Sequence, residues 1–243
     1  LRPRRQRQMC IRDRNKPVRW TATRSELFIS DHQARDHNSV SRLAIANDGK
    51  FIALEINCVA NLGAYMVGSS GGVQVVQYAN LPGTVYKIPS ICLNISAAFT
   101  NKTPTGVFRG PGYAETNLIL ERLIDAAALK HNFDRLELRK KNFVDKGDMP
   151  FTDVLGGSID SGDFSAIFDQ LMTRIDLAGF EERKNESKKK GFLRGLGVAC
   201  FIKGTGGAPK ENVEIRFTSG SRIDLVTGTQ SIGQGHELSL IHI

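Results

Sequence analysis

One stretch, residues 105–116, constrains the fold of this chain more than any other. Its sequence, TGVFRGPGYAET, ends a β-branched and aromatic run in an arginine flanked by glycines, and an amphipathic helix begins directly after it. Glycine lets the backbone approach a ligand closely, and a helix N-terminus carries partial positive charge. The stretch therefore predicts a strand-to-helix turn that presents the guanidinium of Arg109 and free backbone N–H groups to one anion.

A second glycine-punctuated turn lies in the C-terminal part of the chain. Residues 228–237, GTQSIGQGHE, directly follow a strand-like run and carry Gln234 at the tip of the turn. A side-chain amide can donate and accept hydrogen bonds at once, which suits a polar heterocycle.

Together and in this order, the two turns resemble the large, molybdenum-binding subunit of the molybdenum hydroxylases, the family of xanthine oxidoreductase, aldehyde oxidoreductase and aerobic carbon monoxide dehydrogenase. The resemblance covers residues 17–237, and its further motifs are AY at 64–65, YKIP at 86–89, TN at 100–101, ER at 121–122, LRKKNF at 138–143 and DSGDF at 160–164. It implies that the dithiolene of a pterin holds the molybdenum, while the protein contributes hydrogen bonds and no metal ligands.

The resemblance also assigns site residues by motif position. They are Phe108, Arg109 and Gly110 beside the molybdenum, Ile232, Gly233, Gln234 and Gly235 at the pterin, and Pro111 flanking the substrate. An oxo-anionic metal centre needs preorganised donors, and arginine is always charged and has a fixed fork of N–H groups. This interpretation requires Arg109 and Gln234 to converge on one cofactor.

The function implied by the resemblance is hydroxylation of an aldehyde, an N-heterocycle or a similar small molecule, with water as the oxygen source. Implied with it are molybdopterin in its cytosine dinucleotide form, iron–sulfur and FAD partner subunits, a dimer of heterotrimers and a cytoplasmic location. The family's general base, a Glu, matches no residue here, so we expect it outside this chain. We therefore expect the chain to be inactive alone.

Two positions depart from particular family members. Where molybdenum–copper carbon monoxide dehydrogenases carry a copper-binding cysteine, this chain has Gly110, which disfavours a copper bridge. Where xanthine oxidoreductases carry an aromatic ring, this chain has Pro111, which disfavours purine stacking.

Both ends of the chain read as translated sequencing adapter. Residues 1–14 and 238–243 match the translation of a transposase adapter, so we expect them not to be native. Residues 1–14 contain six arginines and one aspartate, so without them the formal net charge falls from +8 to +3. A nucleic-acid partner, which a basic arm would favour, is therefore not expected.

Cysteine and histidine spacing indicates no metal site. Cys58, Cys92 and Cys200 lie far apart in apolar runs and form no C-x-x-C pair, so we expect buried, inert thiols in a reducing compartment. His32 and His37 do not share a helical face, so a polar loop is favoured over a metal site at residues 31–37. No apolar run is long enough to suggest a membrane span.

The patterns predict an α+β fold with mixed or antiparallel sheets, divided into residues 15–190 and 191–237. Strands are predicted at 20–30, 41–46, 51–60, 84–88, 91–99, 196–202, 213–217 and 222–227; helices at 113–132, 135–141 and 164–175; a loop at 68–72; and a solvated charged stretch at 181–190.

Two other function classes remain open at this stage. A non-catalytic paralogue could keep this fold as an assembly scaffold, and a nucleic-acid-binding module would have to bind DNA without the end segments. A carbon monoxide dehydrogenase-like protein lacking the copper cysteine is a third reading. A downstream Glu in a Gly-Glu context, found in the complete gene, would favour the enzyme over the scaffold.

Overall fold

The computed structural model describes residues 21–67, 83–204, 210–220 and 222–229, with the single residues 13, 75, 81, 235, 236 and 238. The chain divides into two compact units, Leu1–Lys203 and Gly204–Ile243. Apart from residues 13 and 238, the end segments 1–14 and 238–243 lie outside the described residues, as does the glycine-rich stretch 68–72. The predicted boundary between residues 190 and 191 stays a prediction.

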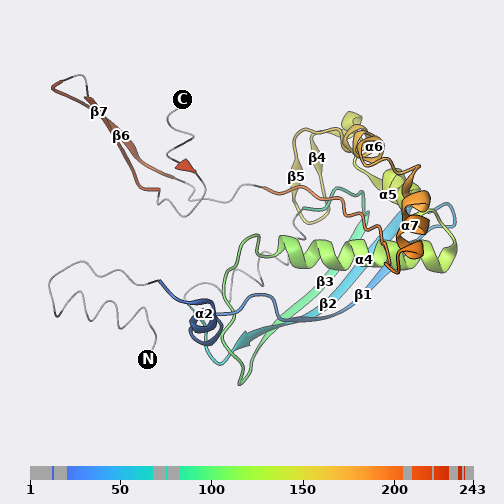
Figure 1. The fold of residues 1–243 in the computed structure, drawn as a ribbon, viewed down its shortest axis with the longest axis horizontal. Helices are drawn as coiled ribbons and strands as arrows, with labels where there is room; N and C mark the ends of the chain where they lie inside the picture. Colours follow the sequence, from blue (N-terminus) through green and yellow to red (C-terminus); the bar gives the residue numbers. More distant parts are fainter. Residues whose placement is uncertain are drawn as a thin grey trace. The chain divides into compact units, whose positions relative to one another are not determined.

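Figure 1 labels the main helices and strands of the described residues. They are α2 (Arg24–Ser30), β1 (His37–Ile45), β2 (Phe51–Gly63), β3 (Ser90–Phe99), α4 (Tyr113–His131), α5 (Arg135–Asn142), β4 (Phe151–Thr152), β5 (Ser158–Ile159), α6 (Phe164–Arg174), α7 (Phe180–Lys189), β6 (Val213–Thr218) and β7 (Arg222–Thr227). A short 3-10 helix, η1 (Lys146–Asp148), lies between α5 and β4.

The first unit is built on a mixed three-stranded sheet. β2 lies between β1, with which it is antiparallel, and β3, with which it is parallel. A tight turn joins β1 to β2, and its Gly49 has a φ of +90°, which glycine adopts readily because it lacks a Cβ. α4 lies across one face of this sheet (Figure 1). Helix packed on a mixed sheet confirms the predicted α+β class.

The core of this unit lies between α4 and β2. Leu54 and Ile56 of β2 and Leu120 and Ile124 of α4 are each at most 1% exposed. Burying one such side chain stabilises a fold by about 1.5–3 kcal/mol. The predicted long helix is confirmed, and it ends where Asn132 turns into the left-handed conformation.

A buried ionic cluster joins α4 to α5. Arg139 is fully buried; its Nε donates to Glu121 Oε2 at 2.8 Å, and its Nη2 lies 2.9 Å from Asp125 Oδ1. The hydroxyl of Tyr86 donates to Glu121 Oε1 at 2.6 Å. Burial raises the pKa of Tyr86, and burial together with the Glu121 charge raises the pKa of Cys200 to about 11. The cluster thus compensates its buried charges internally.

Two predicted helix starts are confirmed by their caps. The Asp134 carboxylate accepts from the backbone N–H groups of Leu136 and Glu137 and begins α5. The Asp163 carboxylate accepts from the N–H of Ala166 and begins α6. Capping needs only residues close in sequence, which is why the sequence predicts these starts well.

Two predicted strands in the first half are wrong. Residues 24–30 form helix α2, because Thr23 and Glu26 make a complete capping box that outweighs the alternating pattern. Residues 84–88 make no strand; Tyr86 forms only an isolated bridge with Phe143. These residues are buried by packing against the core, without a neighbouring strand.

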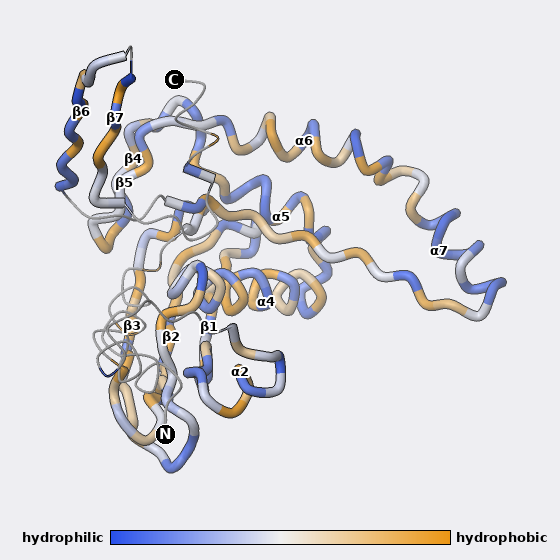
Figure 2. Tube along the Cα trace, turned by 60° about the vertical axis from the view of Figure 1, so that its left-hand side comes forward, coloured by the Kyte–Doolittle hydropathy of each residue, from blue (hydrophilic) through white to orange (hydrophobic). Residues whose placement is uncertain are grey.

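The segment after α6 also differs from expectation. The charged stretch 181–190 lies mostly in helix α7, which is largely hydrophilic in Figure 2. Residues 196–202 form no strand, although Figure 2 shows this segment as largely hydrophobic. Val198, Cys200 and Ile202 pack against the core of the first unit, and the N–H of Ile202 donates to the carbonyl of Gly83 at 3.0 Å.

The second unit contains the predicted antiparallel hairpin of β6 and β7. Ile215 is paired with Leu225, and Phe217 with Ile223, so these side chains share one face of the hairpin. Every residue of β6 is exposed.

Candidate functional site

The stretch that leads into the predicted turn is fixed to the end of β2. Thr105 Oγ1 donates to the carbonyl of Asn61 at 2.7 Å, and the N–H of Gly106 donates to the carbonyl of Gln33 at 2.8 Å. A Cβ at position 106 would lie 2.1 Å from Cδ2 of His32, so any larger residue here would have to displace the His32 ring. The chain therefore leaves the sheet from a fixed point.

The turn itself is open to solvent. Phe108 is 61% exposed and Arg109 is also exposed. Gly110 has a φ of +73°, and no heavy atom of the described residues lies within 4 Å of a Cβ built on it. Gly112 is the N-cap of α4 and supplies no side-chain cap. The exposed part of the turn is therefore Phe108 and Arg109, whereas Gly112 is buried and the N–H of Ala114 donates to the carbonyl of Gly110 at 3.4 Å.

Arg35, which the sequence analysis does not identify as a site residue, supports this turn through hydrogen bonds to its backbone. Its Nη2 donates to the carbonyl of Phe108 at 3.2 Å and also to the carbonyl of Arg109. Its guanidinium carbon lies 5.8 Å from the centre of the Phe108 ring, within the range of a cation–π contact. The two ends of these hydrogen bonds are 73 and 74 residues apart in the chain, so local sequence carries no signal of them.

Glu115 completes this arrangement from the first turn of α4. Its Oε1 lies 3.3 Å from Arg35 Nε, and its side chain is only 5% exposed. A carboxylate in the first turn of a helix is stabilised by the helix dipole. Burial lowers the pKa of nearby His37, and the Glu115 charge opposes that shift. The sequence does contain a signal for Glu115, because this residue lies in the first turn of the helix predicted at residues 113–132.

Comparison with known proteins identifies the family of the chain. A family model described as a molybdopterin cofactor-binding domain matches residues 9–143, and a second model with that description matches residues 170–243. The chain belongs to the molybdopterin cofactor-binding family. The family predicted from the two glycine-rich turns is therefore confirmed.

Known members of the family are similar along almost the whole chain. The carbon monoxide dehydrogenase large chain of Hydrogenophaga pseudoflava is 28% identical, over 94% of this chain and 30% of its own length. The nicotine 6-hydroxylase large subunit of Paenarthrobacter nicotinovorans is also 28% identical, over 93% of this chain and 29% of its own length. Quinoline 2-oxidoreductase from Pseudomonas putida 86 matches with a TM-score of 0.82 and 32% identity, over 96% of this chain and 31% of its own. The chain thus spans less than a third of these relatives.

The described part of the turn fits a molybdopterin cofactor. The space beside Gly110 leaves room for a ligand at the backbone, and the exposed Arg109 supplies a charged donor. Pro111, the predicted substrate neighbour, is partly buried next to them. Among the described residues, no cluster of three His, Cys, Asp or Glu could hold a metal ion.

The second predicted contact region is only partly described. Gly235 has a φ of +78°, as a tight turn requires. Ile232, Gly233 and Gln234 lie outside the described residues, so their contact with the pterin stays a prediction. The convergence of Arg109 and Gln234 is likewise untested, because it joins two separate units.

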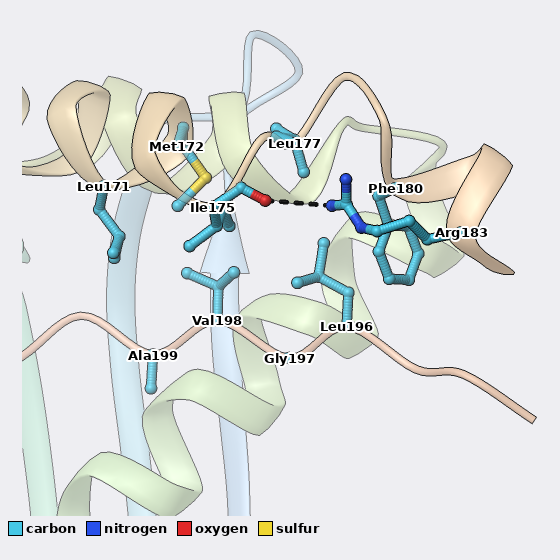
Figure 3. Close-up of a pocket in the computed structure, with 10 residues that line it drawn as sticks. All are labelled: Leu171, Met172, Ile175, Leu177, Phe180, Arg183, Leu196, Gly197, Val198 and Ala199. Carbon is cyan, nitrogen blue, oxygen red and sulfur yellow. Dashed lines mark hydrogen bonds between the residues drawn. The ribbon is translucent and has the colours of Figure 1, made fainter.

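A separate apolar pocket lies elsewhere in the first unit (Figure 3). It has a volume of about 330 Å³ and is lined by α6, the start of α7 and residues 196–199. Figure 3 shows Leu171 and Ile175 facing Val198, with Arg183 Nη2 donating to the carbonyl of Ile175 at 3.0 Å. None of the predicted cofactor residues lines this pocket.

Across the described residues, no helix combines the length and apolar character of a membrane-spanning segment.

Proposed function

We propose that this chain is part of the large subunit of a molybdenum hydroxylase and that residues 107–112 bind the cofactor. The observation that carries the proposal is the open turn at the start of α4, with an exposed Arg109 beside an unobstructed Gly110, in a chain of the molybdopterin cofactor-binding family. The similarity to large subunits of molybdenum-dependent enzymes supports it.

When bound, the molybdenum cofactor supplies the redox chemistry that inserts oxygen from water into the substrate. Arg109 donates charged hydrogen bonds to the oxo face, and its fixed fork of N–H groups requires little reorganisation when charge changes there. Gly110 lets the backbone reach the cofactor, and Pro111 borders the substrate. Phe108 and residues 232–235 are the other cofactor contacts proposed from motif position.

The residues of the turn also narrow the substrate class. Gly110 offers no thiolate, so a copper bridge and carbon monoxide oxidation through it are disfavoured. Pro111 offers no aromatic ring for purine stacking. The names of two relatives, nicotine 6-hydroxylase and quinoline 2-oxidoreductase, refer to N-heterocycles. We propose an N-heterocycle or an aldehyde as the substrate.

The finer features of the complex are proposed on the same resemblance. They are a cytosine dinucleotide form of molybdopterin, electron transfer to iron–sulfur and FAD subunits, a dimer of heterotrimers and a cytoplasmic location.

The test is metal and nucleotide analysis of the purified full-length complex, followed by kinetics. We expect equimolar molybdenum, cytidine monophosphate after acid hydrolysis and no copper. Arg109→Met should lower kcat per bound molybdenum by about 10²–10³-fold, the usual cost of losing one preorganised donor. Arg42→Met, at an exposed arginine of β1, is the matched control. Stoichiometric copper would overturn the argument from Gly110, and a complex without molybdenum would favour the assembly scaffold.

A further inference from the structure

The turn that carries Arg109 depends on one long-range side chain. Within the described residues, the only hydrogen bonds to Phe108 and Arg109 are those that Arg35 donates to their two carbonyls. Both carbonyls precede Gly110, which has a φ of +73° and, because it lacks a Cβ, can adopt many other backbone conformations. The direction in which Arg109 leaves the backbone is therefore set largely by Arg35.

We propose that Arg35, held by Glu115, is a positioning residue that aims Arg109 at the cofactor. This inference rests on the proposed function of the turn. Arg35 touches neither the cofactor nor the substrate in this account and acts only through the backbone of residues 108 and 109.

The chemistry of the contact requires arginine. Arg35 uses Nη2 for the two carbonyls, Nε toward Glu115 and the face of its guanidinium over Phe108. A lysine carries the same charge but has a single ammonium group and no planar fork, so it cannot make these contacts together.

Glu115 offsets the positive charge of Arg35, so that Arg35 and Arg109 can lie close together. Without a counter-charge, Arg35 would repel Arg109 and compete with it for an anionic cofactor. The Glu115 carboxylate faces Arg35 at 3.3 Å, and neither of its oxygens accepts a hydrogen bond from a described residue. The nearby Asp36 carboxylate is already paired with Lys102. Burial lowers the pKa of His37, which disfavours its charged form. Glu115 is therefore the counter-charge available to Arg35.

The backbone of Arg35 provides an independent observation. Its φ is +58°, a left-handed conformation that is uncommon for a residue other than glycine. Strained backbone of this kind concentrates at functional sites, where the surrounding structure holds a side chain in a required position.

The test compares Arg35→Lys and Glu115→Gln with wild type in the full-length complex, and Arg42→Lys serves as the control. We expect hydrogen–deuterium exchange at the amides of residues 107–112 to be at least tenfold faster in both variants. We expect kcat per bound molybdenum to fall about tenfold to a hundredfold, as misplacement of a catalytic group by about 1 Å can cause, with KM within twofold. The molybdenum(V) electron paramagnetic resonance spectrum should shift, and Arg42→Lys should change none of these.

The outcomes separate this inference from the proposed function. Wild type without molybdenum refutes the proposed function, whereas exchange in residues 107–112 still tests the support given by Arg35. Unchanged exchange in the variants refutes the inference. If both variants lose cofactor or stability while the remaining loaded enzyme keeps the wild-type kcat and spectrum, the role of the pair is structural and the inference is overturned.

Discussion

Replacing Arg139 by alanine should destabilise the first unit more than any exposed substitution. Arg139 contacts Glu121 through Nε at 2.8 Å and through Nη2 to its carbonyl at 3.2 Å, and its Nη1 donates to the carbonyl of Arg135 at 2.9 Å. The substitution leaves the Glu121 carboxylate buried, with Tyr86 as its remaining side-chain donor. Removing one partner of a buried ion pair costs about 3–5 kcal/mol.

The loss of stability should depend on which partner of the Arg139–Glu121 pair remains. In the double variant Arg139→Met with Glu121→Leu, neither charge is buried, so we expect it to be more stable than Arg139→Ala despite carrying two changes. Glu121→Gln keeps an acceptor for Tyr86 and leaves Arg139 paired with Asp125, which is 40% exposed. We expect that change to cost about 1.5–3 kcal/mol, the value of a hydrogen bond to a charged group.

Native-state hydrogen exchange of the full-length chain measures these differences at the amides of α4 and α5. Arg122→Ala, at an exposed position of α4, is the control and should change the opening free energy by less than about 0.5 kcal/mol. An Arg139→Ala effect of the same size as the control would refute the account of the cluster, as would a double variant less stable than Arg139→Ala.

Three further predictions concern single residues. Gly63→Ala places a Cβ 2.4 Å from Pro104 Cα at a φ of +72°; it should cost about 2–5 kcal/mol in chemical unfolding, against little change for the unobstructed Gly195→Ala. The pKa of His37 is lowered by burial, so the unfolded state takes up a proton first as the pH falls. The stability of wild type should therefore decline relative to His37→Asn below about pH 6.5, the ordinary histidine pKa, and equal declines in both would contradict this. Cys92 is exposed, so the expectation of a buried thiol is wrong there, whereas burial raises the pKa of Cys200 to about 11. Cys200 should therefore react with iodoacetamide more slowly at pH 8 than Cys92, as peptide mass spectrometry would show.

What the sequence predicts well here is what depends on neighbouring residues. Asp134 and Asp163 cap their helices through N–H groups two or three residues away, and both helices begin where expected. The strand predicted at residues 20–30 is wrong, although the sequence carries a local helix signal there, the Thr23–Glu26 capping box. Local rules therefore suffice for these elements when every local signal is counted.

Pairing between distant segments is where prediction from one sequence stops. The apolar run 196–202 has the composition of a strand, yet it packs as an extended segment, with Ile202 bonded to Gly83. The parallel pairing of β2 with β3 likewise has no local signature. Both depend on which surfaces remain to be covered once the core has formed, and that information is not contained in a short window of sequence.

The candidate site shows the same division within a single turn. The glycines and Arg109 form a contiguous motif, so the sequence predicts which residues meet the ligand. Their direction is set by Arg35, which precedes β1 in the sequence and meets the turn only in the folded chain. Because a donor contributes to catalysis only when it is held where charge develops, a chain that kept the motif but lost Arg35 would keep the family signature and lose rate.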